Sequence, residues 1–267
     1  MGKTFLLAIT ILATIIVTPS LALAQTTESA KTNQKANQQN QKVATLKTKA
    51  ENEINRRLVS LNKLTQKIIS IKKLSAAQKA SLNSQIQSEI TALTSLKTKI
   101  NGDVDVATLK EDVKAIVTSY RIYLLYIPKI HLLAAADIMS ETAEKLASLS
   151  AKLEIRIQQA QAIGKEIVST QATLSDMQNK ITEAGQQYQK IESAVLPLAP
   201  AGYPGNKTIL QSARVLLQIG HQDLQAAWKD AQKISQDLKL LKNKASSTLP
   251  ILPATPTAGS TASSTTQ

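Results

Sequence analysis

The sequence predicts an all-α protein, an elongated antiparallel helical bundle or coiled coil of about five helices. Three observations predict this class. Apolar residues recur at gaps of three and four over most of the chain, which is the spacing of one helix face. Aromatic residues make up only 3% of the chain, which disfavours a β-sandwich. There is no cysteine, so stability has to come from an aliphatic core without disulfide support.

The first 24 residues are typical of a secretory signal peptide. Lys3 precedes an apolar run, and the segment closes on Ala22-Leu23-Ala24, the small-x-small pattern of a cleavage site. We therefore expect cleavage near Ala24 and a mature protein that is secreted or held at the cell surface or in the periplasm. The alternative is an uncleaved anchor, because the segment from Phe5 to Ala24 has about the length that crosses a bilayer.

An arm and a helix follow. Residues 25–42 are polar and rich in Asn, Gln and Lys, which predicts a disordered arm or a frayed helix start. Residues 43–74 are expected to form a helix with one apolar face. That face consists of Val43, Leu46, Ala50, Ile54, Leu58, Leu61, Leu64, Ile68 and Ile71. Ser75 and Gln78 then match a capping box, which predicts a tight turn into a second helix.

The second helix is expected to end at Asn101-Gly102 through a left-handed glycine. Either Asp103 or Asp105 is then suited to cap a third helix, because a short acidic side chain can accept a hydrogen bond from a free backbone N–H of the first turn.

The third helix is predicted to be long and kinked, from near Val106 to near Ile163. Its segment from Ile122 to Met139 is apolar nearly all round, which is typical of a helix enclosed by neighbours. Pro128 lies inside this segment and removes one helical hydrogen bond, so we expect the kink there.

Two more helices are predicted in the C-terminal half. Gly164 is a suitable C-cap, and Ser169 or Thr173 is a suitable N-cap for the fourth helix. Several prolines and glycines between residues 196 and 206 predict a loop. A fifth helix is expected over residues 207–244 from its periodicity.

These lengths suggest two bundles, in which two helices pack on each half of the long third helix. The arrangement corresponds to two spectrin-like three-helix bundles that share a kinked central helix. The N-terminal bundle is expected at residues 43–138 and the C-terminal bundle at residues 139–244. Residues 245–267 are mostly Ser, Thr, Ala and Pro, which predicts a disordered tail.

The middle third contains the turn from Leu96 to Ile116, followed by Tyr120-Arg121-Ile122-Tyr123 and Ala134-Ala135-Ala136-Asp137. Together these stretches resemble a group of secreted, all-helical bacterial proteins with no assigned function. The resemblance implies an exported helical protein, and it carries over no activity and no site residues.

No set of catalytic residues emerges from the sequence. His131 and His221 are far apart, and the chain has no His-Glu-x-x-His motif, Glu-x-x-His pair or phosphate-binding loop. No serine has a histidine base placed beside it by a recognisable motif. We therefore expect no enzyme activity, no catalytic, cofactor-binding or metal-binding residues, and no cofactor.

The positive charge is concentrated near the N-terminus, since residues 25–100 carry 14 Lys and Arg against 4 Asp and Glu. One interpretation is a solvated lysine-rich face that keeps a long helix soluble. The other is attraction to a polyanion such as a wall polymer, anionic lipid or the DNA backbone. The candidate residues are Lys47, Lys49, Arg56, Arg57, Lys63, Lys67, Lys72, Lys73 and Lys79.

Three functions are compatible with these features. The first is an exported, non-enzymatic scaffold or adhesin-like interaction protein of the cell envelope. The second is polyanion binding through the basic N-terminal helices, and the third is a membrane-active, toxin-like helical protein. The partner can be a protein, an anionic envelope polymer, the membrane surface as a peripheral contact, or a second copy. Sequence-specific nucleic acid is not expected, because residues 25–100 contain no aromatic side chain to stack on bases.

Overall fold

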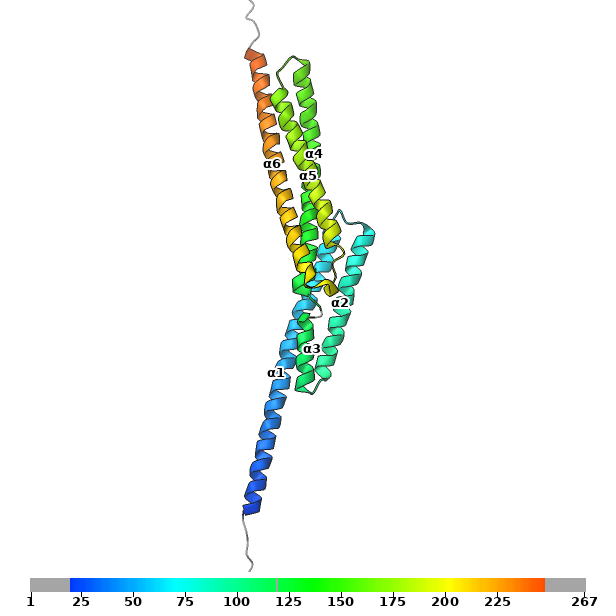
Figure 1. The fold of residues 1–267 in the computed structure, drawn as a ribbon, viewed down its shortest axis with the longest axis vertical. Helices are drawn as coiled ribbons and strands as arrows, with labels where there is room; N and C mark the ends of the chain where they lie inside the picture. The colour runs from blue at the N-terminus through cyan, green and yellow to red at the C-terminus, as the bar shows by residue number, and fades with distance from the viewer. Residues whose placement is uncertain (1–19, 119, 248–267) are drawn as a thin grey trace, which may run out of the picture. The chain divides into compact units, whose positions relative to one another are not determined.

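The computed structural model describes residues 20–118 and 120–247, with side chains for 30–118 and 120–242, and it confirms the all-α class. The helices are α1 (Ser20–Ser70), α2 (Ala76–Gly102), α3 (Val106–Thr118), α4 (Ile127–Ala162), α5 (Val168–Val195) and α6 (Gly205–Ser247) (Figure 1). A π-helical turn, η1 (Ile122–Tyr126), and a 3₁₀ turn, η2 (Pro200–Gly202), complete the described elements. The predicted signal peptide lies outside the described residues apart from residues 20–24, which begin α1, and the predicted tail lies outside them beyond residue 247.

The chain divides into two compact units at places other than the predicted boundary at residues 138 and 139. The first unit takes the chain up to Val59 together with Ser88–Tyr120, and the second takes Ser60–Gln87 together with the chain from Arg121. Both α1 and α2 therefore contribute one end to each unit. This division was hidden from sequence analysis because apolar spacing continues without a break through both helices.

The first unit joins α1, α2 and α3. Lys97 on α2 makes an ion pair with Glu51 on α1 at 2.8 Å and donates to Asn55 Oδ1 at 3.1 Å. Lys99, also on α2, pairs with Asp112 on α3 at 2.8 Å. Charged side chains at the edges of an aliphatic core thus connect all three helices.

Helix α1 begins earlier than predicted, because residues 25–42 belong to it. The disordered-arm alternative is therefore corrected in favour of a helical start. Gln, Lys and Ala have good helix propensity, so a polar helix can form there without a buried face. Every described side chain from residue 30 to residue 42 is exposed.

The seam of α1 differs from the predicted apolar face at two positions. Arg57 is buried and the neighbouring Leu58 is only half-buried, whereas Lys47 and Leu46 are both half-buried and only Lys47 fits the alternating spacing of the seam. With Lys47 and Arg57 included, the seam steps by three and four residues in strict alternation, which is the heptad pattern of coiled-coil packing. A preference for apolar residues alone had displaced the predicted face by one residue at each of these positions.

The helix ends confirm two capping predictions and correct one. The Ser75 N–H donates to Gln78 Oε1 at 2.7 Å and the Gln78 N–H donates to Ser75 Oγ at 3.2 Å, which completes the predicted capping box. Asp105 caps α3 by accepting the Thr108 N–H at 2.8 Å. Gly102 ends α2 but does not have a positive φ, so the predicted left-handed stop is wrong.

The helix predicted over residues 106–163 is interrupted before Pro128 instead of being kinked at it. After α3, Arg121 adopts a left-handed φ of 46°, and the turn η1 leads into α4. Pro128 then falls in the first turn of α4, where its missing N–H removes no required hydrogen bond. The Arg121 guanidinium lies 4.2 Å from the centroid of the Tyr203 ring, a cation–π contact that stabilises the interruption.

In the second unit, α4, α5 and α6 lie side by side (Figure 1). Gly164 ends α4 with φ 74°, as predicted, and α5 starts after Ile167 without the predicted serine or threonine cap. At Gly220 on α6, an added Cβ would lie 2.3 Å from Met139 Sδ, so glycine allows α6 to approach α4 closely there. Residues 60–87 complete this unit with the end of α1 and the start of α2.

The stretch Val106–Ala162 contains an 18-residue window that is apolar and long enough to cross a membrane, and 61% of that window is buried within the described structure. The core helix of a bundle that does not enter a membrane is buried in the same way. The membrane-active alternative therefore stays a prediction.

Candidate functional site

The nine basic residues predicted to meet a polyanion lie along α1 and at the start of α2, and they are divided between the two units. Lys49, Arg56, Lys63 and Lys72 are exposed, Lys47, Lys67, Lys73 and Lys79 are half-buried, and Arg57 is buried. The structure thus distributes these side chains over exposed and enclosed positions, so they do not form one uniform face.

In the first unit, two of the nine pair with one glutamate. Arg56 and Arg57 both form ion pairs with Glu53, one turn earlier on α1. Arg57 is only 4% exposed, so its charge is neutralised inside the seam, and its place in the predicted surface set is corrected. Lys47 donates to the Asn101 carbonyl oxygen at 2.7 Å and so satisfies a free carbonyl at the end of α2.

A regular line of cations lies on the outer side of α1. Lys35, Lys42, Lys49 and Arg56 follow one another at seven-residue intervals and are all exposed; we call them the basic stripe. Seven residues are about two turns, so successive cations lie about 10 Å apart along the helix. Lys35 and Lys42 were missed because their segment was expected to be disordered, although the seven-residue interval was visible in the sequence.

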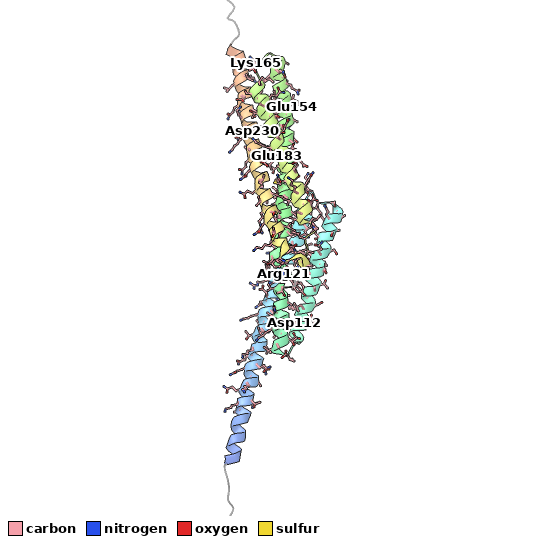
Figure 2. The ribbon with its side chains drawn as sticks, in the orientation of Figure 1. Asp112, Arg121, Glu154, Lys165, Glu183 and Asp230 are labelled. Carbon is pink, nitrogen blue, oxygen red and sulfur yellow. The ribbon has the colours of Figure 1, made fainter. Side chains whose placement is uncertain are left out.

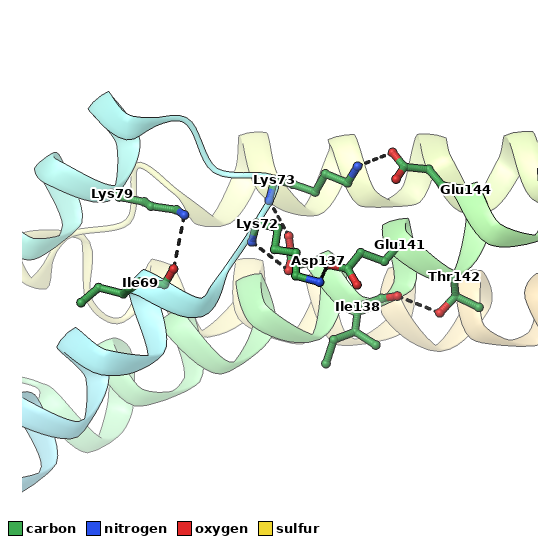
Figure 3. A network of polar contacts seen from close by, with 9 residues as sticks. All are labelled: Ile69, Lys72, Lys73, Lys79, Asp137, Ile138, Glu141, Thr142 and Glu144. Carbon is green, nitrogen blue, oxygen red and sulfur yellow. Dashed lines mark hydrogen bonds and ion pairs between the residues drawn. The ribbon is translucent and has the colours of Figure 1, made fainter.

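In the second unit, Asp137 on α4 holds the turn between α1 and α2 (Figure 3). One carboxylate oxygen accepts the backbone N–H of Lys72 at 3.0 Å, and the other accepts the backbone N–H of Lys73 at 2.6 Å. Asp137 is only 4% exposed, and a buried carboxylate requires such partners. The two amides satisfy the charge, and the charge fixes the position of the turn.

Two ion pairs flank this contact (Figure 3). The Lys72 ammonium lies 2.8 Å from Glu141, and Lys73 pairs with Glu144. The hydrogen bond to Glu141 raises the pKa of Lys72, and the same bond lowers the pKa of Glu141. Lys79 donates to a backbone carbonyl near the end of α1 at 3.3 Å. The side chains of Lys72, Lys73 and Lys79 therefore all make contacts within the chain.

Lys129 is fully buried in α4. Its ammonium donates to the Leu198 carbonyl oxygen at 2.8 Å and to Gln85 Oε1 at 3.2 Å, and neither partner carries a charge. Burial lowers the pKa of Lys129 to about 8. From the sequence, Lys129 was only a polar interruption of an apolar segment, and no spacing rule indicated that it would be enclosed.

Another group of charges lies where α2 meets α3 in the first unit. Asp112 is 8% exposed and accepts from Lys99, whose hydrogen bond lowers the pKa of Asp112. Asp103 lies beside Asp112, and desolvation raises the pKa of Asp103. The hydrogen bond from Lys99 favours the charged form of the buried Asp112 carboxylate. We therefore assign this group a structural role between α2 and α3.

Two neighbouring hollows lie between α4 and α6 in the second unit. The first, of about 440 Å³, is mostly apolar and includes Leu146, Leu224 and Trp228. Trp228 is the only tryptophan of the chain and is 51% exposed. The second hollow, of about 650 Å³, combines apolar side chains with Arg156, Lys165, Lys239 and Lys242.

Among the described residues, no group of three or more His, Cys, Asp or Glu side chains is placed to hold a metal ion. His131 is exposed, and His221 lies at the first hollow. Comparisons of the chain with protein-family models, curated proteins and solved structures found no match.

Replacing Asp137 with alanine should destabilise the protein by about 2–4 kcal/mol, because it leaves two amides of the turn without their charged acceptor. Asp137→Asn should lose less, because one carbonyl oxygen remains to accept. Glu144→Gln is the matched control, since it removes only the partner of a part-exposed lysine and should cost less than about 1 kcal/mol. Urea unfolding followed by circular dichroism measures all three, and equal losses for Asp137→Ala and Glu144→Gln would contradict the assigned role.

Lys129 should make stability depend on pH. Its folded-state pKa of about 8 lies below the ordinary value of 10.5, so the unfolded chain binds more protons between these values. Stability should therefore rise by about 1–3 kcal/mol from about pH 7 to about pH 9.5. In Lys129→Met this rise should disappear, whatever the absolute stability of the variant. Parallel pH profiles for the two proteins would show that another group is responsible.

Proposed function

We propose that this chain is an exported, non-enzymatic helical protein of the cell envelope that acts as a scaffold or adhesin-like interaction module. The observation that carries the proposal is the half-exposed Trp228, which lies in an apolar hollow on the surface of a helical bundle. An exposed aromatic side chain in an apolar hollow is typical of a protein contact site. The part of the proposal that concerns export rests on the signal peptide predicted from the sequence.

The distribution of charge in the second unit supports an interaction role. The carboxylate of Asp137 and the ammonium of Lys129 are buried and used to join helices. Neither lines the two hollows between α4 and α6. The exposed features left for function are helix faces and the grooves between them, which suit contact with another macromolecule.

Fractionation of the source cells tests this proposal. We expect the mature protein in the envelope fraction, with amine-reactive crosslinking producing discrete adducts larger than the monomer. A monomer found only in the culture medium and unchanged by crosslinking would contradict the envelope role. Chains crosslinked through Trp228-containing peptides would identify the hollow as the contact.

Polyanion binding is a second candidate, and the basic stripe is the observation that favours it. Lys35, Lys42 and Lys49 lie on one exposed side of α1. The acidic residues nearest to Lys49 along the helix are Glu51, which pairs with Lys97, and Glu53, which pairs with Arg56 and Arg57. A line of cations about 10 Å apart suits a linear polyanion that runs along the helix.

Neutralising the stripe tests this candidate. We expect Lys35→Gln, Lys42→Gln and Lys49→Gln together to weaken binding of a polyphosphate chain and to reduce the slope of log K against log salt by about one per lysine. The matched control neutralises Lys152, Lys190 and Lys207, which are exposed on helices of the second unit. Fluorescence anisotropy at several salt concentrations measures both variants. Equal effects of the two triple variants would show that only net charge matters.

A further inference from the structure

We propose that the groove between α4 and α6 in the second unit is a docking site for an amphipathic helix with acidic residues at one end. This inference deepens the proposed interaction function, on which it rests, by assigning the surface and the chemistry of the partner. The groove comprises the two hollows, which continue one another along the same two helices.

The two helices run in the same direction along the groove. Thr142 and Leu146 of α4 share the first hollow with α6 residues that begin at His221, and Ile163, directly after α4, shares the second with α6 residues that end at Lys242. The groove thus follows about 21 residues of α4, or about 32 Å of helix. A partner helix of six turns would match that length. No α5 residue lines either hollow, so α5 packs on the other side of the pair.

The residues along the groove repeat at seven-residue intervals. On α6, His221, Trp228, Ser235 and Lys242 form one such column. Thr142 and Arg156 of α4 and Ile163 directly after α4 lie in the same seven-residue register. Columns with a heptad period supply the holes into which the knobs of a further helix insert. A groove between two helices that run in the same direction offers such holes from both sides, which suits a third helix as the occupant.

The composition of the groove changes along its length. At the first hollow, Leu146, Leu224 and Trp228 offer apolar surface to an apolar stripe. At the second hollow the lining includes Arg156, Lys165, Lys239 and Lys242 and no Asp or Glu. Lys165 follows the end of α4 (Figure 2). Four cations without a carboxylate are complementary to an anionic partner, which places the acidic residues of the docked helix at this end.

A second copy of this chain is a poorer occupant, because the chain has a formal net charge of +13 and would bring further cations to this end. The complementary partner is therefore a different protein with an acidic amphipathic helix. Its apolar residues would cover Trp228, and its carboxylates would pair with Lys239 and Lys242.

The test uses the full-length mature protein and a fluorescein-labelled peptide of three heptads, with Leu at positions a and d throughout and Glu at positions e and g of one terminal heptad. The control peptide has Lys in place of every Glu. We expect the Glu peptide to bind and to shift the emission of Trp228, the only tryptophan, to shorter wavelength. The Lys peptide should bind at least about tenfold more weakly, a difference of about 1.4 kcal/mol.

Two variants with the same change of charge locate the binding. Lys239→Glu with Lys242→Glu should weaken binding of the Glu peptide about tenfold or more, equivalent to about 1.4 kcal/mol. Lys190→Glu with Lys207→Glu, exposed on α5 and α6 away from the groove, should change it less than about twofold. Circular dichroism of both variants checks that they remain helical, and Trp228→Tyr provides a folded variant that tests the apolar end.

Equal binding by the two double variants, or no change in Trp228 emission, would overturn the proposal. Emission shifted by anionic phosphatidylglycerol vesicles but not by the Glu peptide would also overturn it and would assign the groove to lipid. These outcomes leave the envelope role intact if cell fractionation still finds crosslinked adducts. Groove binding in a protein that is found only as a free monomer in the medium would instead contradict the envelope role alone.

Discussion

The second unit depends on the carboxylate of Asp137, which connects a turn to a helix that is distant in the sequence. The turn between α1 and α2 has backbone amides that no helix satisfies, and Asp137 accepts two of them. The capping box of α2 begins only two residues later, and its Gln78 Nε2 also donates to Glu192 of α5 at 2.7 Å. One buried charge therefore fixes the turn, and the adjoining cap carries that constraint to α5. A displaced turn would move both attached helix ends, because helices are stiff on this length scale.

Local rules predicted much of this fold. The class, the positions of α2, α5 and α6, the capping box at Ser75 and the end of α4 at Gly164 follow from periodicity and capping chemistry. Each depends on residues within about one helical turn, where sequence determines geometry directly. The same rules missed the polar start of α1, because an exposed helix has no apolar face to reveal it.

The remaining features depend on residues distant in the chain. Lys129 is buried because Gln85 and the Leu198 carbonyl oxygen meet it from α2 and from the loop after α5. The interruption at Arg121 is supported by the ring of Tyr203. No local pattern contains these pairings, since each joins elements separated by tens of residues. The apolar segment follows from the sequence, but no local pattern in it indicates which polar side chains inside the segment find partners.

The cations of this protein show why net charge alone is a poor guide to a binding surface. Arg57 in the seam of α1 pairs with Glu53, and Lys72 pairs with Glu141, so both charges are neutralised within the fold. Lys35 and Lys42 lie outside the seam and remain exposed. The heptad position of each residue decides which of these roles it takes, because packing encloses only some positions. In the groove between α4 and α6, Lys239 and Lys242 have no carboxylate among the lining residues. The excess of positive charge at this hollow is therefore local. An acidic partner can neutralise it, whereas the lysines of α1 and α2 that already pair within the chain need no such partner.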